Sequence, residues 1–165
     1  MDFQRDLYEI QLLKARYVRY MDTRQWEAWR ELFTDDFEYY IDASWKPEST
    51  TPTFKGADAL IAYLSASEPT KITIHQCHTP EIDFLGENTA TGIWALFSWT
   101  DEPSRDFAVK NYGHYHDRYE RGEDGRWRIS ATHLTRLRQN RIENLPSEPM
   151  DVIDRDALKS VGQTT

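Results

Sequence analysis

Apolar and polar positions at the start of the chain repeat with the period of an α-helix. Between residues 3 and 21 a large apolar side chain recurs every three or four positions, which predicts an amphipathic helix. Asp22 and Gln25 then stand at the first and fourth positions of a capping box, so we expect Asp22 to begin a short second helix that runs through Trp26 to Phe33. A third helix is predicted over residues 56–67. The apolar positions of the first helix are Phe3, Leu7, Ile10, Leu13, Tyr17 and Met21.

The rest of the chain has the pattern of β-strands separated by polar turns. Residues 37–41 suit a first strand, and the Pro-rich and Ser-rich segment 43–55 suits a loop. Helices followed by a run of antiparallel strands indicate an α+β fold, in which the helices cover one face of a curved, mostly antiparallel sheet. We expect a single domain over residues 1–142 and a polar tail over 143–165. Four long strands are predicted over about 71–85, 89–100, 107–121 and 126–139.

Composition narrows the class of protein. The chain has 165 residues and a net charge of −8, which argues against nucleic-acid binding through phosphate neutralisation. Cys77 is the only cysteine, so we expect no disulfide and no thiolate metal cluster. The first residues carry charges and no apolar run, and no stretch approaches about 18 apolar residues, so neither a signal peptide nor a membrane span is expected. These features predict a soluble, cytoplasmic domain.

A histidine in an apolar and aromatic neighbourhood marks the most informative segment. Residues 74–82 read IHQCHTPEI and residues 88–94 read NTATGIW, which indicates two strands joined by a tight polar turn at 86–88. Together with YVRYMD at residues 17–22, this motif resembles the SnoaL-like branch of the nuclear transport factor 2-like superfamily. Within that branch the chain is most similar to bacterial bile-acid 7α-dehydratases and scytalone-dehydratase-like proteins. The resemblance extends over residues 5–140 and implies a cone-shaped α+β barrel around one pocket.

The resemblance also implies site residues. The catalytic histidine, aspartate and tyrosine of the dehydratases fall on His75, Asp22 and Tyr17, and their pocket arginine falls on Arg136. A second pocket aspartate of the family is replaced here by Ser98. An imidazole titrates near neutral pH, so it can remove a proton and later return it. A carboxylate beside it would fix its tautomer, and a tyrosine hydroxyl would hold a carbonyl or enolate oxygen.

Each of these residues also has a purely structural interpretation. Asp22 could act only as a helix cap, and Tyr17 could be an ordinary core aromatic. The two lie about 140° apart around an ideal helix, so both face one cavity only if the helix ends between them. Arg136 is out of phase with Trp127 and Ile129 under strict strand alternation, so it shares their face only if a bulge intervenes.

Three further positions are candidates for contact with the substrate. Ser98 and Trp94 follow the strand motif, and His114 is the histidine that we expect to reach the pocket. His114 and His116 share one face of a strand, but two histidines without a nearby carboxylate are a weak metal signal. We therefore expect no metal and no other cofactor.

The leading hypothesis is a cofactor-independent lyase of the dehydratase type, or an isomerase, that acts on a hydrophobic cyclic carbonyl compound. The 13% aromatic content is generous enough to line a pocket for such a ligand and to cover a subunit interface, so a homodimer or homotrimer is expected. A second hypothesis is a non-catalytic scaffold, because residues 21–36 also resemble the β-subunit of ring-hydroxylating dioxygenases. A small-molecule carrier is a third.

Overall fold

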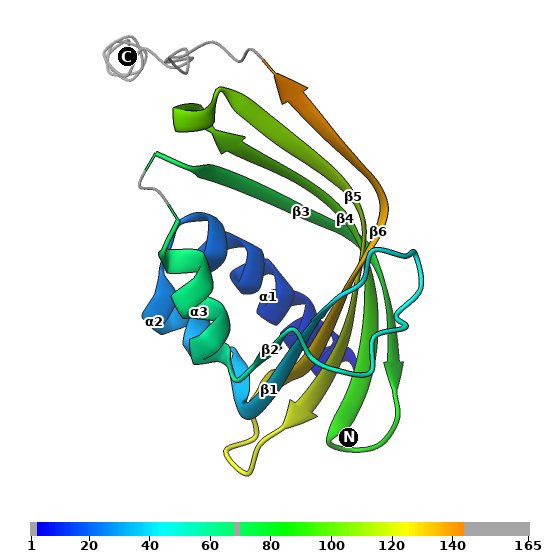
Figure 1. The fold of residues 1–165 in the computed structure, drawn as a ribbon. Coiled ribbons are helices and arrows are strands. Elements are labelled where there is room, and N and C mark those ends of the chain that lie inside the picture. The colour runs from blue at the N-terminus through cyan, green and yellow to red at the C-terminus, as the bar shows by residue number, and fades with distance from the viewer. Residues whose placement is uncertain (1–2, 68–69, 144–165) are drawn as a thin grey trace, which may run out of the picture.

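The protein is an α+β fold in which three helices lie in the concavity of one strongly curved sheet (Figure 1). The computed structural model describes residues 3–67 and 70–143. None of the described helices is long and apolar enough to cross a lipid bilayer. The elements are α1 (Phe3–Asp22), α2 (Trp26–Arg30), β1 (Phe33–Ile41), β2 (Phe54–Lys55), α3 (Ala57–Ser65), β3 (Ile72–Phe84), β4 (Thr89–Glu102), the 3₁₀ turn η1 (Pro103–Arg105), β5 (Phe107–Arg121) and β6 (Trp127–Glu143).

The sheet has the order β2-β1-β6-β5-β4-β3. Every neighbouring pair is antiparallel except β1 and β6, which are parallel, so the predicted fold class is confirmed. The four long strands β3 to β6 follow one another along the chain and curve together around the helices (Figure 1). They fall close to the predicted ranges, and β5 coincides with the predicted strand at 107–121.

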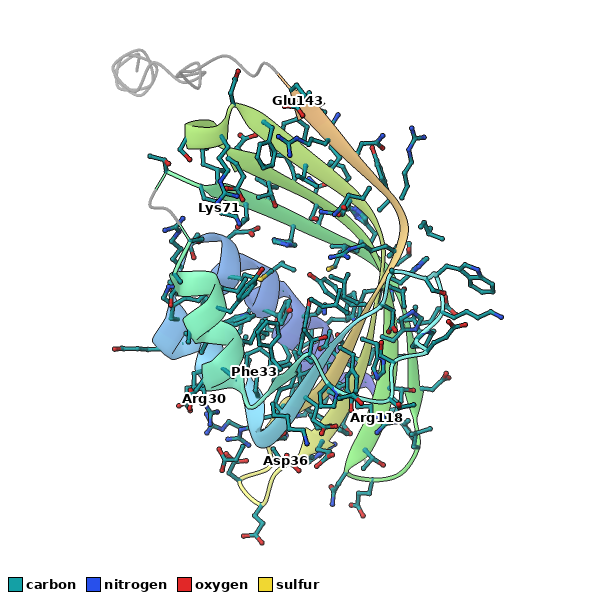
Figure 2. The ribbon with its side chains drawn as sticks, in the orientation of Figure 1. Arg30, Phe33, Asp36, Lys71, Arg118 and Glu143 are labelled. Atoms are coloured by element: carbon teal, nitrogen blue, oxygen red, sulfur yellow. The ribbon has the colours of Figure 1, made fainter. Side chains whose placement is uncertain are left out.

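The core lies between the helices and the concave face of the sheet. Side chains around Phe33 fill the space there (Figure 2). The indole N–H of Trp29 donates a hydrogen bond of 3.0 Å to the carbonyl oxygen of Tyr17, which ties α2 to α1. The buried face of α1 presents four of the apolar residues that the helical period predicted, namely Ile10, Leu13, Tyr17 and Met21.

Two local predictions are wrong. Asp22 is the last residue of α1 and does not cap α2, whose flanking residue Gln25 makes no side-chain cap. The reason is tertiary, since the Asp22 carboxylate is occupied by hydrogen bonds from β3. The second helix also ends at Arg30 rather than Phe33, which begins β1. Of the predicted polar tail, residues 144–165 lie outside the described residues.

Two irregularities in β6 decide which of its side chains face the helices. Ile129 pairs with Tyr119 while Ala131 pairs with Arg118, so Ser130 is an extra residue and forms a bulge. Because one extra residue reverses the alternation, the buried Trp127 and Ile129 share the concave face with Leu134 and Arg136 beyond the bulge. A second register shift follows where Gly113 pairs with Arg136 but Tyr112 pairs with Arg138.

Candidate active site

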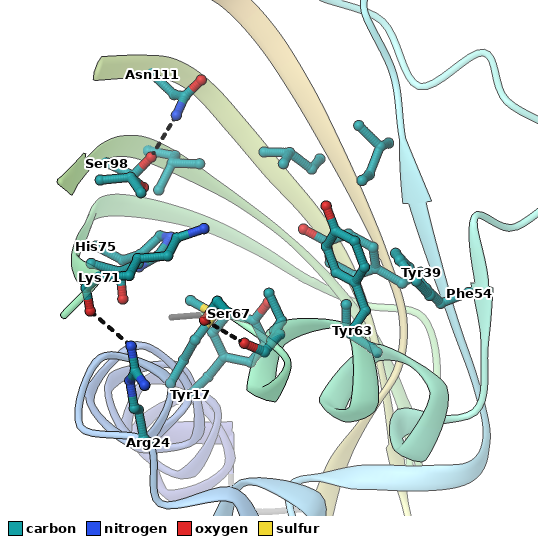
Figure 3. Close-up of a pocket in the computed structure, with 18 of the residues that line it drawn as sticks. Tyr17, Arg24, Tyr39, Phe54, Tyr63, Ser67, Lys71, His75, Ser98 and Asn111 are labelled. Carbon is teal, nitrogen blue, oxygen red and sulfur yellow. Dashed lines mark hydrogen bonds between the residues drawn. The ribbon is translucent and has the colours of Figure 1, made fainter. Parts of the chain in front are cut away.

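A cavity of about 540 Å³ lies between the helices and the concave face of the sheet. Its wall combines apolar and aromatic side chains from α1, α3 and the sheet with a set of polar and charged groups (Figure 3). His75, Ser98 and Arg136 all line it, together with Tyr17. Apolar lining comes from Met21, Leu60, Leu64, Leu96 and Leu134.

His75 and Asp22 form a hydrogen-bonded pair on this wall. The imidazole Nδ1 lies 2.6 Å from Asp22 Oδ1, so the contact expected from the sequence is present. The backbone N–H of His75 donates to Asp22 Oδ2 at 2.8 Å, and the hydroxyl of Thr73 donates to Oδ1 at 3.0 Å. Both side chains are mostly buried, with 13% of His75 and 19% of Asp22 exposed. These three donors compensate for the placement of a carboxylate at the negative end of the α1 dipole.

The pair fixes the chemistry of the imidazole. An ionised carboxylate only accepts hydrogen bonds, so Nδ1 carries the proton that it donates to Asp22. The second ring nitrogen, Nε2, is thereby left for a molecule in the cavity that His75 lines. Asp22 itself is not part of the lining, because α1 continues through it and turns its carboxylate behind His75. Tyr17 and Asp22 therefore serve the site from different sides, and α1 does not end between them.

Three tyrosines form a buried group on the cavity wall. The side chains of Tyr17, Tyr39 and Tyr115 all line the cavity, and the ring centroids of Tyr17 and Tyr115 lie 5.7 Å apart. Burial raises the pKa of each phenol above its ordinary value. The phenols consequently stay protonated at neutral pH and can donate hydrogen bonds to a ligand oxygen. Sequence reasoning selected Tyr17 only, because nothing local told Tyr39 and Tyr115 from other strand aromatics.

A buried ion pair contacts two of these three tyrosine rings. Lys14 Nζ lies 2.8 Å from Asp117 Oδ2, and both side chains are almost fully buried. The same ammonium group lies 4.3 Å from the ring centroid of Tyr17 and 3.9 Å from that of Tyr115. The hydroxyl of Thr132 donates to Asp117 Oδ1 at 2.8 Å. Cation–π contacts with Lys14, which is itself fixed by Asp117, therefore help to hold the rings of Tyr17 and Tyr115 on the cavity wall.

A row of polar side chains crosses the sheet beside the histidine. Ser98 pairs with His75 across β3 and β4, and Asn111 pairs with Ser98 across β4 and β5. The amide of Asn111 donates to the Ser98 hydroxyl at 3.2 Å (Figure 3), and Gln139 donates to the Asn111 carbonyl at 2.7 Å. Because Ser98 Oγ accepts one bond, its own proton remains available to a ligand oxygen. Ser98 therefore gives this wall a neutral hydrogen-bond donor.

Two candidate substrate contacts from the sequence are not on the cavity wall. His114 alternates with Gly113 and Tyr115, so its side chain lies on the convex face of the sheet, near His116. Trp94 lies on the concave face but is 5% exposed, and its indole N–H donates to the hydroxyl of Tyr119 at 2.8 Å within the packed core. The structure therefore places neither side chain on the wall of this cavity.

Histidine, carboxylate and thiol side chains are the groups that could hold a metal ion or act as a nucleophile. Within residues 3–67 and 70–143, no three His, Cys, Asp or Glu side chains are grouped so that they could hold a metal ion. Burial raises the pKa of the Cys77 thiol to about 11, so this side chain is a neutral thiol rather than a thiolate. The groups gathered on the cavity wall are those of acid–base chemistry and oxygen recognition.

Comparisons with known proteins agree with this fold. A family model described as a SnoaL-like domain matches residues 4–133. A type 2 hexachlorocyclohexane dehydrochlorinase (LinA) is 18% identical with a TM-score of 0.76, and the match covers 92% of this chain and 98% of that one. A scytalone-dehydratase-like protein from Novosphingobium aromaticivorans is 20% identical with a TM-score of 0.65, covering 90% and 95%.

One neighbour represents a different kind of protein. The β-subunit of the benzoate 1,2-dioxygenase from Burkholderia mallei is 17% identical with a TM-score of 0.60, covering 77% of this chain and 87% of that one. At identities this low, structural likeness establishes the shared fold alone. The fold is thus common to dehydrochlorinase and dehydratase-type proteins and to a dioxygenase subunit, and function has to be argued from the site.

Proposed function

The chain belongs to the SnoaL-like family, and on that premise we propose that it is a cofactor-independent lyase or isomerase acting on a hydrophobic cyclic carbonyl compound. The observation that carries the proposal is the His75–Asp22 pair, whose imidazole lines a cavity with a largely apolar surface. A base that is oriented by a carboxylate and faces such a cavity is suited to removing a proton from carbon.

The reaction begins with transfer of a carbon-bound proton to Nε2 of His75. The proton comes from the position α to the carbonyl, or from its vinylogue, and the electron pair moves onto the carbonyl oxygen to give an enolate. Asp22 stabilises the imidazolium through Nδ1, and the Tyr17 hydroxyl donates a hydrogen bond to the enolate oxygen. The raised pKa of Tyr17 favours donation of a hydrogen bond over transfer of its proton.

Two outcomes are open to the enolate. In dehydration its electron pair re-forms the carbonyl and expels a hydroxyl group from the β or vinylogous position, and the proton on Nε2 converts that group to water. In isomerisation the same proton is returned to a different carbon of the conjugated system. Both routes use His75 as base and then acid, so the residues support the class of reaction rather than a choice between them.

A scaffold or carrier would make weaker use of these features. A subunit that only supports a partner does not require a cavity-lining histidine whose ring is held by a carboxylate behind it. A carrier would require the cavity but not the oriented base. The dyad therefore favours the catalytic interpretation.

The test is turnover of cyclic β-hydroxy ketones and β,γ-unsaturated ketones, followed by the ultraviolet absorbance of the conjugated product. His75→Ala should lower the rate by about 10²–10⁴-fold, the usual effect of one general acid–base group. His78→Ala is the matched control, because His78 lies on the same strand, is exposed and does not line the cavity. Tyr17→Phe should lower kcat more than it changes KM. Equal rates for wild type and His75→Ala would reject the proposal.

A further inference from the structure

We infer that the natural ligand of the cavity carries a carboxylate group, which pairs with the guanidinium of Arg136. This inference deepens the proposed function by naming a feature of the substrate. It concerns binding and can be tested without turnover.

The guanidinium of Arg136 is the first support. It lines the cavity, and its Nε is buried without a hydrogen-bond partner. Within the part of the chain that the structure describes, no carboxylate forms an ion pair with it. Arg136 as a whole is partly buried. A partly buried guanidinium with a buried, unpaired N–H and no counterion is favourable only if something else supplies an acceptor. The cavity is the place from which that acceptor can come.

The local backbone is arranged so that this cation faces inward. Arg136 would point to the convex face without the bulge at Ser130. Opposite it stands Gly113, where an added Cβ would lie 1.9 Å from the carbonyl oxygen of Thr135. Only glycine allows β5 to approach β6 this closely beside Arg136. The bulge at Ser130 and the close approach of the strands at Gly113 are both departures from regular sheet geometry. Both occur where the Arg136 side chain is placed facing the cavity.

The charges of the residues that line the cavity also favour an anionic ligand. The chain has 28 acidic and 20 basic residues, yet four of the five charged side chains among the described lining residues are cationic. The one anion, Glu102, already pairs with Lys71 at 2.9 Å. A cleft with an excess of positive charge in an otherwise acidic protein attracts anions in preference to neutral molecules. The cationic lining residues are Arg24, Lys71, Arg105 and Arg136.

The position of Arg136 favours a permanent anion over the enolate formed during the reaction. His75 is on β3 and Arg136 is on β6, three strands away, which separates their backbones by roughly 14 Å along the curved sheet. The tyrosine hydroxyls already offer neutral donors for the enolate oxygen. A guanidinium presents two parallel N–H groups that match the two oxygens of a carboxylate. The carboxylate would therefore anchor the end of the substrate away from the reacting carbon.

The experiment compares two probes that differ only in charge, 2-naphthoate and its methyl ester, by calorimetric titration of the full-length protein at pH 7. Wild type should bind the acid about tenfold more tightly than the ester, or better, as expected for a charge-assisted hydrogen bond in a cavity. Arg136→Gln should reduce this ratio to about 1, and Arg136→Lys should retain part of it. Arg138→Gln is the matched control, since Arg138 is exposed on the same strand and does not line the cavity.

Three results would overturn the inference. The first is that wild type binds 2-naphthoate no more tightly than the methyl ester, or does not bind it at millimolar concentration. The second is that a folded Arg136→Gln protein keeps the wild-type ratio of the two affinities. The third is that Arg138→Gln loses that ratio. Circular dichroism of each variant establishes that it is folded. A protein that prefers the acid but converts no cyclic ketone would keep this inference and refute the lyase proposal. A protein that converts neutral ketones without preferring the acid would do the reverse.

Discussion

Replacement of Asp22 by Asn tests whether the carboxylate controls the imidazole. In the wild type Asp22 accepts three hydrogen bonds, from the backbone N–H of His75, from Thr73 and from Nδ1 of His75. An amide has a single acceptor oxygen. If that oxygen keeps the bond to the His75 backbone, the amide NH₂ faces Thr73 and Nδ1. The hydroxyl of Thr73 can rotate to accept, whereas Nδ1 can accept only after losing its proton.

The expected result is a change of tautomer with a modest loss of stability. Nε2 would then carry the proton of the neutral ring and could no longer act as a base. Loss of the charge-assisted bonds should lower the free energy of unfolding by about 1–2 kcal/mol. The rate should fall by about 10²–10⁴-fold, which corresponds to roughly 3–5 kcal/mol of transition-state stabilisation.

Long-range ¹⁵N–¹H correlation spectra of histidine-labelled protein measure the tautomer directly and require no substrate. Spectra are recorded in a titration that is continued until the ring signals no longer change with rising pH, so that the neutral ring is observed. The His75 signals should report an Nδ1–H ring in wild type and an Nε2–H ring in Asp22→Asn. His75→Ala assigns the signals by their disappearance. An Nδ1–H ring in both proteins, or wild-type turnover by Asp22→Asn, would show that Asp22 does not control the tautomer of His75.

Three further predictions concern stability. Gly113→Ala should lower the free energy of unfolding in urea by about 1–3 kcal/mol, because the new Cβ would lie 1.9 Å from a backbone oxygen of β6. Lys14→Met should cost about 3–5 kcal/mol in the same assay, since its carboxylate partner would stay buried without a cation. Burial alone would raise the pKa of Asp42, but hydrogen bonds from Ser49 and the nearby His133 lower it overall. Asp42 therefore binds protons more readily in the unfolded chain, and its stabilising effect should fade as pH falls below about 4. Asp42→Asn should lack that part of the acid loss in urea titrations across pH.

Local periodicity was sufficient for most of the fold. The apolar repeat of α1 and the alternation of β3 to β6 are visible in short windows, so the α+β class and the long strands were predicted correctly. The capping box at Asp22 failed because the carboxylate has partners on β3, 53 residues away in the chain, that no local pattern reveals. Tertiary hydrogen bonds outweighed a local cap.

The site was less accessible to sequence reasoning. Family resemblance singled out Tyr17, Asp22, His75 and Arg136, but alternation alone placed Arg136 on the wrong face, since the bulge at Ser130 has no sequence signature. The same limit applies to His114. Strand alternation predicts that the side chains of His114 and Tyr115 lie on opposite faces of the sheet. Which of these side chains lies toward the cavity depends on the face against which the helices pack.

The most direct test of the central claim is hydrogen–deuterium exchange into cyclic ketones and enones. A panel of such compounds is incubated with the protein in deuterated buffer and analysed by mass spectrometry, which detects proton abstraction whether or not elimination or isomerisation follows. Wild type and His78→Ala should both incorporate deuterium at carbons activated by the carbonyl, whereas His75→Ala should fall to the background rate. Deuterium incorporation by His75→Ala equal to that of wild type, or no incorporation above background by wild type across the panel, would contradict the role of His75 as the base.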